Sequence, residues 1–158
     1  MMQTGDLQAF DRLYDLLAGR ALRTAAGILL SAQDAADAAQ EAFIRVWSNI
    51  DSYHPTRPFA PWFYRILINE CRRVLKKRRV FSTLEMIAER PAPTEEVAEI
   101  EINEALDRLP ERQRMAISLK YLSGLSEKDV AKLMHTTQPA VKSLLTRARD
   151  TLRKEFEP

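Results

Sequence analysis

Aromatic rings and cations alternate in the segment FAPWFYRILINECRRVLKKRR, residues 59–79. At about 100° per residue, an ideal helix gathers one ring, one amide and four cations on a single face. This face consists of Trp62, Arg65, Asn69, Arg72, Arg73 and Lys76. Cations neutralise phosphates with a salt-dependent gain in affinity, and a ring can stack on an exposed base. The face predicts binding of nucleic acid with unpaired bases. The alternative is a solvated basic face with Trp62 at the rim of the core.

A second basic face lies in the segment LSEKDVAKLMHTTQPAVKSLLTRARDTLRK, residues 125–154. Ser126 and Thr137 are good helix N-caps, and the letters HTT between them predict a tight turn. The second helix opposes an apolar arc with the polar residues Lys142, Ser143, Thr146, Arg147, Arg149 and Arg153. A short helix, a tight turn and a helix with a cationic outer face predict a helix-turn-helix that reads the major groove. The alternative is a helical hairpin with a solvated basic face.

The segment SAQDAADAAQEAFIRVWSNI, residues 31–50, predicts an amphipathic helix capped by Ser31. Its core stripe is expected to consist of Ala39, Phe43, Val46 and Ile50. The opposite face carries Asp37, Gln40, Glu41, Ile44 and Ser48, with Trp47 at its edge. A polar rim around apolar anchors is typical of a protein-docking surface. The alternative is an ordinary solvated helix face.

Charge is segregated along the chain, although the net charge is only +2. Residues 65–79 hold seven basic side chains against one acid, and residues 138–154 hold five against one. Between them, residues 81–107 carry eight acids against one base. This pattern predicts two sites for a polyanion, joined by a segment that avoids it.

Glycine is scarce, and apolar residues recur at intervals of three and four almost throughout, which predicts an all-α protein. Helices are expected near residues 5–19, 21–30, 32–50, 60–79, 97–108, 111–123, 127–134 and 138–155. The segment RVFSTLEMIAERPAPTEEV has two prolines and no clear apolar stripe. We therefore expect two small helical domains, residues 1–79 and 98–158, joined by an acidic linker over residues 80–97.

Residues for catalysis or metal binding are sparse, and no nucleophile–base pair, metal cluster or glycine-rich phosphate loop is present. His54, His135 and the single Cys71 lie far apart, so we expect no enzyme, no cofactor and no metal site. Cys71 is expected to be a buried apolar residue. The N-terminal residues show no signal pattern, and no apolar run approaches the roughly 18 residues of a membrane span. A cytoplasmic protein without membrane insertion is expected.

Taken together, these segments resemble the extracytoplasmic-function (ECF) sigma factors, the small bacterial initiation factors of RNA polymerase. The stretch DAADAAQEAFIRVWSNIDSY is similar to the polymerase-binding part of sigma domain 2. The stretch RPFAPWFYRILINECRRVLKKRR is similar to the part that melts promoters and recognises the −10 element. The stretch LDRLPERQRMAISLKYLSGLSEKDVAKLMHTTQPAVKSLLTRARDTLRK resembles sigma domain 4, which reads the −35 element. The resemblance covers nearly the whole chain except the linker.

The resemblance implies three sets of contact residues. The clamp helices of the polymerase β′ subunit would contact Asp37, Gln40, Glu41, Phe43, Ile44 and Trp47, of which Phe43 also fits the core stripe. The −10 element would contact Tyr53, Phe59, Trp62, Arg65, Asn69, Arg72, Arg73 and Lys76, with the loop DSYHPTRPF capturing a flipped base. The −35 element would contact Gln138, Lys142, Ser143, Thr146, Arg147 and Arg149.

The resemblance also implies partners and a mechanism. The polymerase β flap, promoter DNA and an anti-sigma factor are expected partners, and the linker would run toward the RNA exit channel. Two residues depart from the family pattern, because His135 stands where the turn usually has glycine and Pro139 follows Gln138. Histidine tolerates positive φ better than most residues, so the turn is expected to form. The competing function is a helix-turn-helix regulator that acts without being a polymerase subunit.

Overall fold

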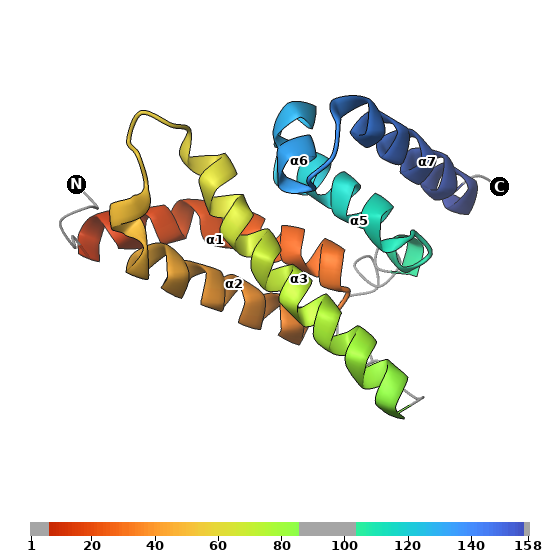
Figure 1. Ribbon diagram of the computed structural model, residues 1–158, viewed down its shortest axis with the longest axis horizontal. Helices are drawn as coiled ribbons and strands as arrows, with labels where there is room; N and C mark the ends of the chain where they lie inside the picture. Colours follow the sequence, from red (N-terminus) through yellow and green to blue (C-terminus); the bar gives the residue numbers. More distant parts are fainter. Residues whose placement is uncertain (1–6, 86–103, 157–158) are drawn as a thin grey trace.

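Three long helices form the N-terminal half of the chain in the computed structural model, which describes residues 7–85 and 104–156 (Figure 1). They are α1 (Leu7–Leu29), α2 (Ala32–Ser48) and α3 (Phe59–Glu85), and each packs against the other two. Small residues of α1 and α2, such as Ala21, Ala25, Ala35 and Ala42, are buried where the helices meet. Alanine allows close approach of the helix axes, and the large rings of α3 fill the remaining space.

Helix α1 is one continuous helix, so the predicted pair of helices over residues 5–19 and 21–30 was wrong. Gly19 lies inside it, since an isolated glycine costs about 1 kcal/mol relative to alanine and does not break a well-packed helix. The helix ends at Leu29, and the next residue, Leu30, has a left-handed φ of 57° and donates its N–H to the carbonyl of Ala26 at 2.8 Å. Ser31 then caps α2, as predicted, by accepting from the N–H of Asp34 at 3.1 Å.

A short loop joins α2 to α3 through the 3₁₀ turn η2 (Ile50–Ser52). Pro61 lies in the first turn of α3, where its missing N–H breaks no intrahelical hydrogen bond. The helix continues to Glu85, beyond the predicted end at residue 79, so the first residues assigned to the linker are helical. The remainder of the predicted linker lies outside the described residues.

The C-terminal half is a group of shorter helices. After a helical segment over residues 104–107 come α5 (Glu111–Ile117), the π-helical turn η3 (Ser118–Leu122), α6 (Glu127–Leu133) and α7 (Gln138–Phe156). The predicted helix over residues 111–123 therefore changes its winding at Ser118. Of the predicted helix over residues 97–108, only the part from residue 104 is described. Val130, Val141 and Leu145 are fully buried between α6, α7 and their support.

The two halves pack directly on each other. The C-terminal half of α1 contacts α5 and η3, and α3 contacts α6, so the buried apolar side chains form a single cluster (Figure 1). The described residues are helical without strands, which confirms the predicted all-α fold with two helical domains. None of the described helices combines the length and apolarity needed to cross a bilayer.

Candidate nucleic-acid and protein interfaces

Three aromatic rings cluster at the start of α3. The ring centroid of Tyr53 lies 5.3 Å from that of Phe59 and 5.1 Å from that of Trp62. The Tyr53 hydroxyl also donates to the carbonyl of Arg57 at 2.5 Å, which closes the loop before α3. All three residues are half-buried, so part of the cluster stays accessible to solvent. The structure thus brings together the three aromatic residues predicted for the −10 element, next to the exposed loop over residues 54–58.

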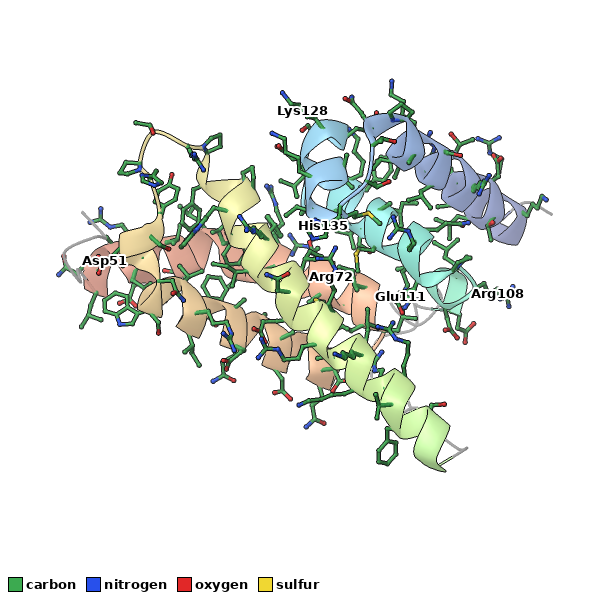
Figure 2. All side chains as sticks on the ribbon, viewed as in Figure 1. Asp51, Arg72, Arg108, Glu111, Lys128 and His135 are labelled. Carbon is green, nitrogen blue, oxygen red and sulfur yellow. The ribbon has the colours of Figure 1, made fainter. Side chains whose placement is uncertain are left out.

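A line of cations continues along α3 from the aromatic cluster. Arg65, Asn69, Arg73 and Lys76 are exposed, as a phosphate-binding face requires. Arg72 differs, because its Nη2 donates to the carbonyl of Leu133 in α6 at 2.7 Å. In Figure 2, Arg72 lies where α3 meets the C-terminal domain. Burial lowers the pKa of the Arg72 guanidinium, and repulsion from Arg112 lowers it further.

Glu70 lies within the apolar arc of α3, and the structure explains its presence there. Its carboxylate is 6% exposed and lies 2.5 Å from Nε of Arg45 on α2, with Nη2 of Arg73 at 3.9 Å. The ion pair crosses from α3 to α2 and satisfies a charge that would otherwise be buried alone. Sequence reasoning missed this pair, because it depends on which turn of α2 lies beside Glu70.

Cys71 is fully buried, as predicted. Burial, with a smaller contribution from the neighbouring Glu70 carboxylate, raises the pKa of its thiol to about 12. The thiol is therefore protonated at neutral pH and is a poor nucleophile. The part of the chain that the structure describes contains no group of three potential metal ligands.

The helix-turn-helix forms as predicted, with both expected N-caps. Ser126 accepts from the N–H of Asp129 at 3.1 Å, and Thr137 accepts from the N–H of Ala140 at 3.2 Å. The turn between them is a Schellman motif, in which the N–H of Thr136 donates to the carbonyl of Ala131. His135 occupies the left-handed position with a φ of 54°, so the turn forms without glycine.

Helix α7 separates its two faces as predicted. Val141, Leu145 and Ala148 are fully buried. The exposed side chains include all six residues predicted for the −35 element, Gln138, Lys142, Ser143, Thr146, Arg147 and Arg149. Nη1 of Arg149 donates to the hydroxyl of Tyr121 at 2.6 Å, so this cation is tied to η3. The Thr146 hydroxyl donates to the carbonyl of Lys142 in its own helix.

Helix α2 presents the predicted docking face. Asp37, Gln40 and Ile44 are exposed, and Ile44 keeps 51% of its surface accessible. Phe43 points into the core with 4% exposure, so the side chain that fitted both the core stripe and the contact set lies in the core. Trp47 is half-buried, with its ring centroid 5.0 Å from that of Phe10 on α1.

An apolar groove of about 730 Å³ runs between α1 and α2 beside this face. Its lining includes the exposed Leu7, Tyr14, Leu22 and Ile44. Apolar anchors next to exposed carboxylates suit a helical protein partner. The sequence pattern found the α2 side of the groove and missed the α1 side, although Leu7, Tyr14 and Leu22 recur at helical spacing.

The comparisons with known proteins agree with this geometry in both domains. Residues 10–80 match the family model for Sigma-70 region 2, and residues 95–152 match the model for Sigma-70, region 4. The chain is 30% identical to the ECF RNA polymerase sigma factor SigW of Bacillus subtilis (strain 168), over 98% of this chain and 92% of that protein. It is 29% identical to the ECF RNA polymerase sigma-E factor of Escherichia coli (strain K12), over 99% and 91% of the two chains.

Solved structures are similar as well. The sigma factor RpoE from Bartonella quintana, in a complex with the anti-sigma factor NepR, matches with a TM-score of 0.81 and 25% identity. That match covers 94% of this chain and 97% of the other. CnrH, solved with the cytosolic domain of CnrY, shares the fold with a TM-score of 0.75 at 23% identity, over 96% and 90% of the two chains.

Proposed function

The chain belongs to the extracytoplasmic-function family of RNA polymerase sigma factors, and we propose on this basis that it directs core RNA polymerase to promoters. The observation that carries the proposal is that one chain has two separate basic faces, each suited to nucleic acid. One is the aromatic and basic face of α3, and the other is the exposed basic face of α7. The protein acts as a dissociable specificity subunit and carries out no catalysis itself.

Helix α2 is the proposed docking site for the clamp helices of the polymerase β′ subunit. Ile44 supplies an exposed apolar anchor, while Asp37, Gln40 and Glu41 supply a polar rim. Phe43 supports this surface from within the core, where it contacts the rings of Tyr14 and Phe63. The C-terminal domain engages the β flap, which leaves α7 free to face DNA.

The α3 face is the proposed site for the −10 element. Trp62, beside Tyr53 and Phe59, offers a ring to a base only after that base has left the duplex. Arg65, Asn69, Arg73 and Lys76 contact the backbone of the opened strand, and Arg72 joins them when it is released from α6. Strand opening is favoured because only an unpaired base can stack on the Trp62 ring.

The α7 face is the proposed site for the −35 element. Lys142 and Arg147 can donate hydrogen bonds to guanine edges or to phosphates, and the Ser143 hydroxyl can hydrogen-bond to base edges or to phosphates. Reading two DNA elements through two linked domains raises the effective concentration of each domain at its site. The short linker, whose acidic residues after Glu85 lie outside the described part of the chain, connects the two DNA-reading domains along the polymerase.

An anti-sigma factor is the proposed regulator. RpoE of Bartonella quintana was solved with the anti-sigma factor NepR, and its likeness to this chain covers both domains together. The α1–α2 groove and the exposed Ile44 offer an apolar surface to such a partner. The chain is proposed to act in the cytoplasm, where the polymerase is.

Runoff transcription tests the proposed function. Core RNA polymerase is incubated with promoter fragments from the source genome, with and without the protein. We expect transcripts that start a fixed distance downstream of a shared two-element sequence, and only when the protein is present. Ile44→Asp should abolish these transcripts by removing the apolar anchor, whereas Leu16→Asp, at an exposed aliphatic residue of α1 outside the groove, serves as the matched control. Equal DNA binding without polymerase and no dependent transcript would favour the independent helix-turn-helix regulator.

A further inference from the structure

One cation on the outer face of α7 is held by a side chain from another element. Nη1 of Arg149 donates to the Tyr121 hydroxyl at 2.6 Å. Tyr121 belongs to η3 and keeps 53% of its surface exposed. Within the described part of the chain, neither side chain has a second hydrogen-bond or ion-pair partner. A hydrogen bond on the surface adds little to the stability of a fold, so stability does not account for this exposed pair.

The backbone that presents Tyr121 is closed by its own hydrogen bonds. The N–H of Ser123 donates to the carbonyl of Ser118 at 3.2 Å, which is the spacing of a π-helical turn. The Ser123 hydroxyl donates to the carbonyl of Leu119, whose side chain is fully buried. The turn also packs against α5 and α6. Single π-helical turns occur frequently at functional sites. Tyr121 therefore projects from a fixed support.

Arg149 lies far along α7 and is turned toward η3. On an ideal helix it shares a stripe about 60° wide with Lys142 and Thr146. The N-terminal residues of a recognition helix contact base edges, whereas Arg149 follows Gln138, the first residue of α7, by about three turns. A guanidinium at this position meets the sugar-phosphate backbone. Contacts of that kind fix the register of a protein on its duplex.

The bond between the two side chains leaves donors free for an anion. The Tyr121 hydroxyl accepts from Arg149, so its own hydrogen can be donated to a phosphate oxygen. The guanidinium has five N–H groups, and the bond to Tyr121 uses one of them. Hydrogen bonds from arginine to phosphate are charge-assisted and therefore strong. Because Tyr121 already restricts the long Arg149 side chain, binding a phosphate loses less conformational entropy.

We propose that Tyr121 and Arg149 form a phosphate-binding pair that anchors the −35 duplex by its backbone. The inference rests on the proposed function and adds to it a contact residue from η3, outside the helix-turn-helix. In this pair Tyr121 donates to the phosphate and positions Arg149. Arg149 then contributes affinity and register, and it reads no base. In Figure 1, α7 lies at the outer edge of the C-terminal half, where a duplex has access to it.

A double-mutant cycle tests the pair. Tyr121→Phe removes only the hydroxyl, and Arg149→Ala removes the guanidinium. Promoter binding is measured by competition, with holoenzyme assembled from core polymerase and each variant. We expect Tyr121→Phe to weaken binding about three- to tenfold, and to have a smaller effect when Arg149 is replaced by alanine. Arg153→Ala, one turn further along α7, is the matched control because it removes the same charge without a bond to Tyr121.

Three outcomes of this cycle would overturn the proposal. The first is wild-type affinity in Tyr121→Phe. The second is an equal loss from Tyr121→Phe in the wild-type and Arg149→Ala backgrounds. The third is a loss that is explained by weaker binding to core polymerase or by a lower urea midpoint, because the pair would then serve polymerase binding or folding and not DNA.

Neutral phosphates locate the contact. A methylphosphonate removes the charge of one phosphate and keeps the base sequence, and it is placed at each position of the −35 duplex in turn. We expect one position at which it weakens wild-type binding about three- to tenfold and leaves the binding of Arg149→Ala unchanged. The loss should be smaller for Tyr121→Phe and complete for Arg153→Ala. If every replacement weakened Arg149→Ala as much as wild type, the pair would not contact a phosphate.

These measurements separate the pair from the proposed function. If the wild-type chain directs core polymerase to promoters and Tyr121→Phe is indistinguishable from it, the phosphate-binding pair is rejected and the proposed function stands. If the wild-type chain with core polymerase neither binds nor transcribes any promoter, the proposed function is rejected, and the pair is rejected with it.

Discussion

The Glu70 carboxylate of α3 lies 2.5 Å from Nε of Arg45 on α2, so one ion pair joins two helices of the N-terminal domain. Glu70 is 6% exposed, whereas the Arg45 side chain is 39% exposed. The carboxylate therefore depends on Arg45 more than Arg45 depends on it. Because Arg73 is 3.9 Å away and largely in solvent, it compensates only in part.

Arg45→Met is expected to lower the free energy of unfolding by about 1–3 kcal/mol, because it leaves a buried carboxylate without its main partner. The double variant Arg45→Met with Glu70→Met should recover part of this loss, since it removes both charges. Urea unfolding followed by circular dichroism measures both. Glu41→Gln is the control, because Glu41 contacts Arg45 only at the surface, at 3.5 Å. If Arg45→Met were as stable as wild type, the Glu70 carboxylate would be stabilised by solvent and not by Arg45.

A second prediction concerns the stability effect of two residues with left-handed backbone, His135 in the turn of the helix-turn-helix and Gly124 before α6. His135 has a φ of 54° and an exposed side chain, so His135→Gly should raise the free energy of unfolding by up to about 1 kcal/mol through relief of backbone strain. Gly124 has a φ of 74° with open space around its Cα, so Gly124→Ala should lower it by about 1 kcal/mol through strain alone. Urea midpoints that moved in the same direction would contradict the argument.

Alkaline pH should destabilise the protein through Cys71. Burial raises the pKa of its thiol from 9.0 to about 12, so between these values the unfolded chain loses a proton that the folded chain keeps. The unfolded state then binds fewer protons, and stability falls as pH rises. Burial raises the pKa of Tyr64 as well and acts in the same direction. The urea concentration at the unfolding midpoint should decrease as the pH rises from 9.0 toward about 12, and it should decrease less steeply in Cys71→Ala. If the midpoint depended on pH equally in wild type and in Cys71→Ala, the loss of stability at alkaline pH would arise from groups other than Cys71.

Trp62 is predicted to stack on an unpaired base. Trp62→Ala should weaken binding of the polymerase–protein complex to a single-stranded −10 oligonucleotide by about 1–3 kcal/mol, while Trp62→Phe should retain much of the affinity. Fluorescence anisotropy with a labelled oligonucleotide measures this. Thermal melting must accompany it, because Trp62 also packs against Tyr53 and Phe59. Equal affinities of the Ala and Phe variants at equal stability would remove the stacking role.

Arg147 is predicted to read the −35 element from α7. Arg147→Ala should reduce binding to a promoter with an intact −35 element by about 1–3 kcal/mol, and should have less effect once that element is scrambled. Arg153→Ala, in the last turn of the same helix, is the matched control for loss of charge. Competition filter binding with both promoters gives the comparison. An equal loss on both promoters would mean that Arg147 contacts phosphate alone.

Local features of this fold could be read from the sequence because each depends on residues close in the chain. Ser31, Ser126 and Thr137 each cap a helix whose N–H groups lie within three residues. The buried face of α7 follows from its apolar spacing, and the left-handed turn at His135 follows from the need to end α6. Such predictions use only helix geometry and hydrogen-bond accounting, so they do not depend on tertiary packing.

Contacts between distant segments could not be read in this way. The continuous helix through Gly19 depends on packing against α2 and α3, which outweighs a weak local propensity. The close approach of Ser118 to Gly27 depends on how the two domains meet. The hydrogen bonds from Arg72 to Leu133 and from Arg114 to Ile28 depend on the same contact. The sequence did carry one signal, because a glycine inside an apolar helix often marks a close approach. That signal identifies Gly27 as a site of close approach, but it does not show which element packs against it.

The last turn of α1 bears on how this protein can be divided for study. Its terminal carbonyls are bound by Arg78 of α3, which reaches Leu29 at 2.6 Å, and by Arg114 of the other domain, which reaches Ile28. A recombinant fragment that stops before α5 keeps the first arginine and loses the second. It also exposes the part of α1 around Gly27 that η3 covers in the whole chain. Fragments of this chain are therefore poor substitutes for the whole protein in crystallisation and ligand screening.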